Sequence, residues 1–311
     1  GERLPYFSFK NADMKKKRPL FGKGFPKIRA PRLLNRPLFK RKQEDEEEMR
    51  NLPIKIVRRD PFGNVVFLKR MLVSMLATLT YGRFNIINKL NIEGTEHLEE
   101  LPNKNVLFIS NHQTYFADMM AMYHIFCSVK WHFRNSVKWP LYLLMPRANV
   151  FYIAAEETMK DSGLVPKILS YTGAVTVKRS WRHKGQEVSR GADRSAPEKI
   201  KKALDYGWVV TFPQGTTSPN APIRKGVAQL IQKYEPIVVP VKIDGFRRAF
   251  DKKGLRFKKR GVNLHVKFEA PLEYTVDEPV DSLLEKIAKG IGQEEALRRT
   301  KKKEDDTTSD S

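Results

Sequence analysis

The chain has little cysteine and no long hydrophobic run. The first shortage excludes a fold held by disulfides, and the second excludes a helix that crosses a membrane. With Cys127 as the single cysteine, an internal disulfide and a cysteine-based zinc site are both excluded. Cys127 lies just after the apolar run 119–126, so we expect it in the core. The longest apolar helical stretch, Met71 to Tyr81, is far shorter than the ~20 residues that cross a bilayer.

Acidic residues are also scarce relative to basic ones. Lys and Arg number 58 against 35 Asp and Glu, a net charge of +23. An imbalance of this size indicates a polyanionic partner, such as nucleic acid, an anionic membrane surface or an acidic carrier. No apolar segment typical of a secretory signal follows the basic start of the sequence. We therefore expect a cytoplasmic protein that is peripheral on the inner face of the cell membrane.

The two ends of the sequence have a composition typical of disorder. Residues 1–60 are predicted to be a disordered arm, basic to about residue 42 and then acidic at 44–48. Residues 276–311 are predicted to form a C-terminal helix, over 281–298, and a disordered charged tail.

A helical apolar pattern occupies residues 61–90. Val65, Leu68 and Leu72 begin a run of apolar residues at spacings of three and four, which predicts an amphipathic helix. Such a helix either packs on the core or lies in a membrane interface. In the second case, basic residues such as Lys69 and Arg70 would meet anionic head groups.

Residues 91–275 alternate short apolar runs with helical segments. The predicted strands are 106–110, 149–153, 174–178, 208–212, 237–243 and 264–268, and the predicted helices are 117–128, 163–170, 196–206 and 224–234. This alternation predicts an α/β domain with a mostly parallel sheet flanked by helices. Ligands of such sheets bind outside the carboxyl ends of the strands.

Two polar motifs follow predicted strands at that position. The segment 110–118 contains His112 and Asp118, and a carboxylate beside an imidazole is the basis of a general base. The segment 212–218 contains a Pro-Gln-Gly-Thr turn, whose N–H groups and hydroxyls suit an anion. Together the two motifs indicate group transfer to a hydroxyl or an amine.

Four motifs in order extend this pattern. They are Asn111-His112 with Asp118, Val177-Lys178-Arg179, Phe212-Pro213-Gln214-Gly215-Thr216 and Val239-Pro240-Val241. Their order resembles the four sequence blocks of the glycerolipid acyltransferase superfamily, which includes the 1-acylglycerol-3-phosphate and lysophospholipid acyltransferases. The resemblance runs from about Ile92 to Pro271 and implies the glycerol-3-phosphate acyltransferase-like α/β fold.

The resemblance also implies a reaction. A fatty acyl group would pass from a thioester, acyl-CoA or acyl carrier protein, to a hydroxyl of a lysolipid, with no cofactor and no metal. His112 would deprotonate the hydroxyl, and Asp118 would orient His112. The expected substrate-binding residues are Asn111, Lys178, Arg179, Pro213, Gln214, Gly215, Thr216, Arg224 and Lys225.

The sequence departs from the family's pattern at three places. Five residues separate His112 from Asp118 instead of four, and one extra residue turns a helical side chain by about 100°. Gln214 and Thr217 stand where the third block commonly has Glu and Arg, so we expect Arg224 or Lys225 to supply the missing charge, or an acceptor other than lysophosphatidic acid, such as a lyso-aminolipid. A basic insertion, 181–191, separates the second and third blocks.

Two other functions remain open at this point. The basic charge is compatible with a nucleic-acid-binding protein, although no nucleic-acid motif or aromatic platform is visible. The departures are compatible with a catalytically dead lipid-binding protein, which the distance between His112 and Asp118 would test. A second basic patch, 252–260, is either a solvated hairpin or a docking site for an acidic carrier or lipid head groups.

Overall fold

The structure is a computed structural model, which describes residues 58–159, 164–178, 182–183, 186–187, 193 and 195–298. These residues belong to one compact unit, Ile56–Ser311. Nearly all of the predicted N-terminal arm, the C-terminal tail beyond residue 298 and Arg179 lie outside the described residues.

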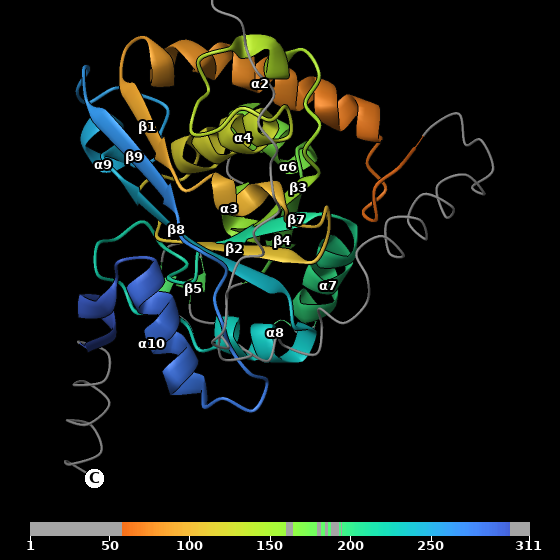
Figure 1. The fold of residues 1–311 in the computed structure, drawn as a ribbon, viewed down its shortest axis with the longest axis vertical. Helices are drawn as coiled ribbons and strands as arrows, with labels where there is room; N and C mark the ends of the chain where they lie inside the picture. Colours follow the sequence, from red (N-terminus) through yellow and green to blue (C-terminus); the bar gives the residue numbers. More distant parts are fainter. Residues whose placement is uncertain are drawn as a thin grey trace, which may run out of the picture. The chain divides into compact units, whose positions relative to one another are not determined.

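The described part of the chain is built on a seven-stranded sheet with the order β1-β9-β8-β2-β7-β3-β4 (Figure 1). The strands are β1 (Lys89–Glu93), β2 (Val106–Ser110), β3 (Val150–Ala155), β4 (Ala174–Val177), β7 (Trp208–Thr211), β8 (Ile237–Asp244) and β9 (Asn263–Phe268). The five strands from β8 to β4 run parallel to one another, and only the pair β8–β9 is antiparallel. The predicted α/β class with a mostly parallel sheet is therefore confirmed.

Burial explains which strands the sequence reveals. Strand β2 lies between β7 and β8 and is buried at all five positions, as its apolar run predicts for a central parallel strand. Strand β1 lies at the sheet edge and buries only Ile92. Its sequence, Lys-Leu-Asn-Ile-Glu, alternates polar and apolar residues over only five positions, and the strand was not predicted.

Helices cover both faces of the sheet (Figure 1). One face carries α2 (Val66–Asn85), α3 (Glu96–Glu99), α4 (Ala117–Val129), the 3-10 helix η2 (Pro140–Leu143), α6 (Leu164–Tyr171) and α9 (Phe246–Ala249). The other face carries α7 (Ala196–Tyr206), α8 (Gly226–Tyr234) and α10 (Val280–Gly290). The short helix α5 (Glu156–Met159) follows β3, and the expected insertion contains the two-residue strands β5 (Arg182–His183) and β6 (Gln186–Glu187).

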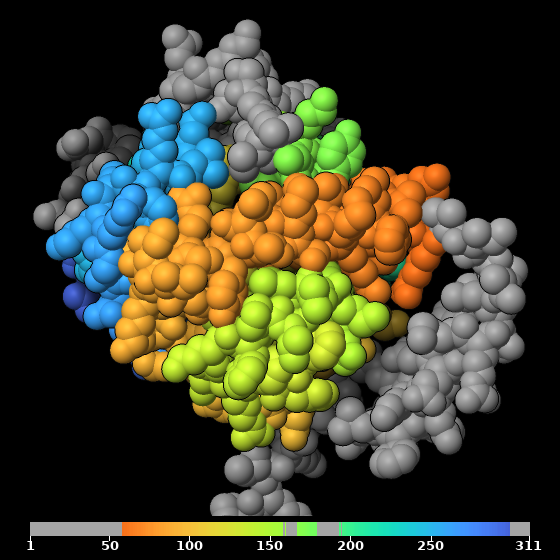
Figure 2. All heavy atoms as spheres, turned by 90° about the horizontal axis from the view of Figure 1, so that it is seen from above, coloured from red at the N-terminus to blue at the C-terminus, as the bar shows by residue number. Residues whose placement is uncertain are grey.

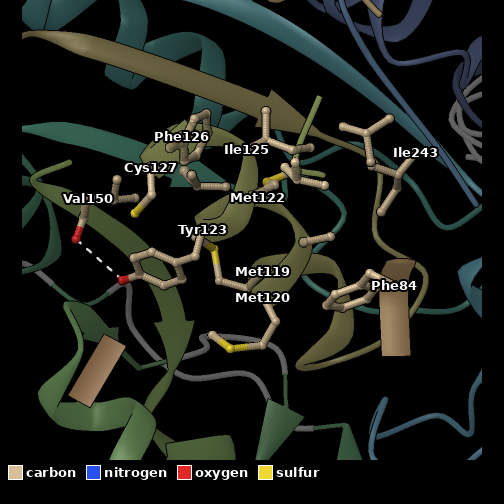
Figure 3. Packing of buried hydrophobic residues seen from close by; sticks show 14 of the residues in the cluster. Phe84, Met119, Met120, Met122, Tyr123, Ile125, Phe126, Cys127, Val150 and Ile243 are labelled. Atoms are coloured by element: carbon tan, nitrogen blue, oxygen red, sulfur yellow. Dashed lines mark hydrogen bonds between the residues drawn. The ribbon is translucent and has the colours of Figure 1, made fainter. Parts of the chain in front are cut away.

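Helix α4 is the centre of the larger core, because all thirteen of its residues are buried. Its side chains pack against α2 and the sheet. Figure 3 shows Phe84 of α2 and Ile243 of β8 beside the side chains of α4, among them the sulfur of Cys127. His124, also on α4, contacts Thr80 Oγ1 at 3.0 Å and Tyr142 Oη at 2.8 Å. Burial lowers the pKa of His124 to about 3, so this histidine is neutral and joins α2, α4 and η2.

Helix α2 is apolar on two faces. Its inner face packs on α4 through Val73, Leu76 and Phe84, while Phe67 and Leu79 on its outer face are 76% and 69% exposed. Lys69 belongs to the inner face: its Nζ donates to Val150 O at 3.0 Å and lies 3.7 Å from the ring centre of Phe151. The expectation that Lys69 meets lipid head groups is therefore wrong, because its side chain is buried.

The C-terminal helix is shorter than predicted. Helix α10 ends at Gly290, and the chain turns at Gly292, which has a φ of +65° that disfavours other residues. Residues 294–298 are helical again. None of the helices in the described residues has the length and the apolarity that crossing a membrane requires.

Candidate active site

Three of the expected motifs meet at the carboxyl end of the five parallel strands, because each of them follows one of these strands. His112 follows β2, Pro213 follows β7, and Lys178 follows β4. Strands β7 and β8 flank β2, so the chain after each of them lies beside the His112 loop. We call residues 111–116 the His112 loop and residues 213–218 the third-block loop.

His112 and Asp118 form a direct pair. His112 Nδ1 lies 2.9 Å from Asp118 Oδ2, and the Asp118 side chain is fully buried. Because a carboxylate only accepts hydrogen bonds, Nδ1 carries the proton and Nε2 is the basic ring nitrogen. The imidazole also stacks on Phe212, with ring centres 3.9 Å apart and an interplanar angle of 18°.

The extra residue between His112 and Asp118 is absorbed in the His112 loop, before α4 begins at Ala117. Asp118 Oδ2 accepts the backbone N–H groups of Gln113 at 2.6 Å and Thr114 at 3.0 Å. Asp118 Oδ1 accepts the Thr114 hydroxyl at 2.7 Å. The carboxylate therefore folds the loop around itself, which keeps His112 within hydrogen-bond reach despite the longer spacing.

A cavity of about 530 Å³ lies next to His112. Three basic residues are among those that line it, namely Lys178, Arg224 and Lys225. Apolar and aromatic side chains also line it, among them Tyr115, Met119, Tyr152, Met159, Ile200, Val227 and Leu230. The cavity lining thus combines a base, basic residues and apolar side chains. Within the described residues no group of His, Cys, Asp and Glu side chains has a metal-binding arrangement.

Comparison with protein families agrees with this geometry. The family model described as Acyltransferase matches residues 89–244, half of the chain, a range that includes His112, Asp118 and the three motifs that follow them. The chain belongs to the acyltransferase family. The expected membership of an acyltransferase family is thereby confirmed, and the glycerolipid substrate class stays a prediction.

Solved structures similar to this acyltransferase include the 1-acyl-sn-glycerophosphate acyltransferase PlsC from Thermotoga maritima, at 22% identity, with 73% of this chain and 78% of that chain covered and a TM-score of 0.41. A search of curated proteins finds no match.

Five expected substrate residues of the acyltransferase line the cavity together with His112. They are Lys178, Pro213, Gly215, Arg224 and Lys225. Thr216 follows Gly215 but is not among the lining residues, and its Oγ1 lies 3.3 Å from Ser218 Oγ. Arg179 falls outside the described residues.

Two expected substrate residues have structural bonds instead. Asn111 is buried, and its side-chain amide exchanges two hydrogen bonds with the backbone of Ile243, at 2.9 and 2.8 Å. Gln214 is also buried, and its Nε2 donates to Ala221 O at 2.8 Å and Gln293 Oε1 at 3.0 Å. Neither residue lines the cavity, because the protein itself occupies their polar groups.

Arg247 is a site residue that the sequence analysis missed. Its Nη2 donates to Thr217 O in the third-block loop at 2.7 Å and lies 3.5 Å from His112 O. Arg247 follows the carboxyl end of the predicted strand 237–243, and that position was the available signal. Its contacts depend on β8 pairing beside β2, which no local pattern shows.

Proposed function

We propose that this protein is an O-acyltransferase that moves a fatty acyl group from a thioester donor to a hydroxyl of a lysolipid. The observation that carries the proposal is the His112–Asp118 pair, 2.9 Å apart, with His112 in the wall of a cavity that basic and apolar residues also line. The donor is acyl-CoA or acyl carrier protein, which is a co-substrate, and the residues used need no cofactor.

In the proposed mechanism, His112 Nε2 removes the proton of the acceptor hydroxyl as its oxygen attacks the thioester carbonyl carbon. The C–O bond forms, and collapse of the tetrahedral intermediate breaks the C–S bond. The imidazolium then returns the proton to the thiolate, while Asp118 stabilises the positive charge. General base catalysis of this kind contributes ~10²–10⁴-fold, and positioning of the two substrates contributes the rest.

The basic lining residues suit the head group of the acceptor. Lys178, Arg224 and Lys225 give the cavity positive charge that favours a phosphate, as expected for lysophosphatidic acid or a lysophospholipid. Thr217 offers no charge where the family commonly has Arg, so a lyso-aminolipid is a second acceptor of the same class. The apolar lining residues, Met119 among them, are the place for an acyl chain.

We further propose that an anionic membrane surface is the partner of one face of this protein. The exposed apolar residues of α2 and of the segment around η2 gather there, namely Phe67, Leu68, Met71, Met75, Leu79, Trp139, Leu141, Leu144 and Met145. Figure 2 shows α2 and this second segment side by side. Lys138 and Arg147, both exposed, lie in the same segment and suit anionic head groups. Peripheral attachment at the inner face of the cell membrane fits this surface and stays a prediction.

Acyl transfer into a panel of lysolipids tests the proposed reaction. Labelled acyl-CoA and acyl carrier protein are offered with each acceptor to the wild type and to His112→Ala. We expect acceptor-dependent product from the wild type and a loss of at least ~10²-fold in the variant. His265→Ala, which changes an exposed histidine on β9, is the control and keeps full activity. Equal turnover by His112→Ala and wild type would refute the mechanism.

A further inference from the structure

The corner that follows β8 brings one arginine to both loops of the site. Gly245 makes the turn with a φ of +89°, where an added Cβ would lie 2.4 Å from Asn263 O. This geometry requires glycine and starts α9 directly beside the end of β2. Arg247 is the second residue of α9 and is partly buried.

The Arg247 side chain contacts two segments that are far apart in the sequence. Its Nη2 donates to Thr217 O at 2.7 Å, in the third-block loop, and reaches His112 O at 3.5 Å. The same residue also holds the His112 loop through its backbone, because Arg247 N donates to Gln113 Oε1 at 3.1 Å. The Gln113 amide group in turn donates to Ile243 O at 3.2 Å, so the corner and the loop are joined at several points.

The neighbouring arginine has a different environment. Arg248 is exposed, and its Nη2 pairs with Asp244 Oδ2 at 2.9 Å, at the end of β8. A surface pair of this kind contributes little to stability. The two arginines thus carry the same charge and lie on the same short helix. Of the two, Arg247 contacts the His112 loop and the third-block loop, whereas Arg248 pairs with Asp244.

We propose that Arg247 is a positioning residue that holds the His112 loop and the third-block loop in one fixed relation. A planar guanidinium can donate to two carbonyl oxygens at once, which an ammonium group does less well. The base on one loop and the acceptor-binding turn on the other must keep their separation during transfer, and a misplacement of about 1 Å costs on the order of 10²-fold in rate. This inference rests on the proposed acyl transfer.

Three variants test the inference: Arg247→Ala, Arg247→Lys and the matched control Arg248→Ala. We expect Arg247→Ala to lower kcat and raise the acceptor KM, with kcat/KM reduced at least ~10-fold. Arg247→Lys is expected to be intermediate, and Arg248→Ala to stay within about twofold of wild type. The assays are made well below the Tm of each variant, and circular dichroism verifies the fold. Unchanged kinetic constants in Arg247→Ala would overturn the inference.

A second measurement separates the failure of this inference from the failure of the proposed reaction. Diethylpyrocarbonate modifies histidine, and mass spectrometry gives the rate at which it modifies His112. This rate shows how firmly the His112 loop is held when no substrate is present. We expect faster modification in Arg247→Ala than in Arg248→Ala. Faster modification together with a wild type that transfers no acyl group would refute the proposed function and support the positioning role. Equal modification rates in the two variants would overturn the positioning role.

Discussion

At the scale of single residues, Asp118 shows how one buried carboxylate organises a catalytic loop. Its carboxylate accepts hydrogen bonds from the His112 ring, from two backbone N–H groups and from the Thr114 hydroxyl. These donors offset the cost of burying a charge, which would otherwise be several kcal/mol. Five residues between His112 and Asp118 would keep the two side chains apart only if the whole segment were helical. The segment before Ala117 is a loop, so the pair can meet.

Lys69 gives a prediction at the same scale. Burial lowers the pKa of Lys69 to about 8, from 10.5. Between these two values the unfolded chain binds more protons than the folded one, so the free energy of unfolding rises with pH in this window. Relative to Lys69→Met, the wild type is expected to gain about 1 kcal/mol between about pH 7 and about pH 9.

Urea unfolding at several pH values measures this difference. The control is Lys202→Met, which changes an exposed lysine on α7 and is expected to follow the wild type across the whole range. If the curves for the wild type and Lys69→Met stay parallel, burial does not govern the titration of this lysine.

At the scale of elements, the link between the third-block loop and the end of α10 explains one departure from the family pattern. Gln214 Nε2 faces two acceptors, Ala221 O and Gln293 Oε1. A glutamate at residue 214 would place a carboxylate against the Ala221 carbonyl, so an amide is the fitting side chain. This amide closes the loop that precedes Arg224, and the turn after α10 holds it in place.

The link predicts an effect of the distant residue Gln293 on acceptor binding. Gln293→Leu removes the oxygen that accepts the hydrogen bond of Gln214. We expect this variant to raise the KM for the lysolipid about 3- to 10-fold, the equivalent of one lost hydrogen bond. Gln293→Glu keeps an oxygen acceptor and is expected to restore most of the affinity. Steady-state kinetics with the best acceptor of the lysolipid panel measures both variants.

Gln232→Leu is the matched control for this prediction. Gln232 Nε2 donates to Glu278 O at 2.6 Å and ties α8 to the segment before α10, without touching the third-block loop. Its loss is expected to lower the Tm with an unchanged acceptor KM. A KM that changes equally in both leucine variants would show a general effect of loosening α10.

At the scale of the whole described unit, the two helical layers differ in what they expose. The layer with α2 and η2 leaves a group of large apolar side chains exposed, Leu144 at 82% among them. Such a group on one face marks an interaction surface. Figure 1 places α10 on the opposite side of the sheet, where the buried residues Leu283 and Ile287 make its apolar side part of the core.

This asymmetry predicts which substitutions weaken membrane binding. Leu79→Asp and Leu144→Asp each remove an exposed apolar side chain and add a repelling charge. Sedimentation with vesicles of phosphatidylcholine and phosphatidylglycerol is expected to show at least ~10-fold weaker binding, since burying one such side chain is worth ~1.5–3 kcal/mol. Val276→Asp, in the segment before α10, is the control and is expected to bind like the wild type. Equal binding by all three variants would refute the proposed surface.

The sequence by itself determined the elements that bury continuous apolar runs and the motifs that follow them. Strand β2 was predicted at 106–110 and α7 at 196–206, because apolar runs and a proline in the first helical turn are local properties of the chain. The expected cap is absent, since the Ser195 hydroxyl donates to Asp193 Oδ1 at 2.6 Å instead of capping α7. His112 and Asp118 were selected from the same local information.

Tertiary structure decided what depends on partners distant in sequence. Only the pairing of β8 beside β2 brings Arg247 to the His112 loop, and only the packing of α2 turns Lys69 inward. Likewise, Asn111 and Gln214 belong to the expected motif, yet their amides bond to Ile243 and Gln293, far along the chain. A residue type limits which bonds a side chain can make, whereas the fold determines which partner lies within reach.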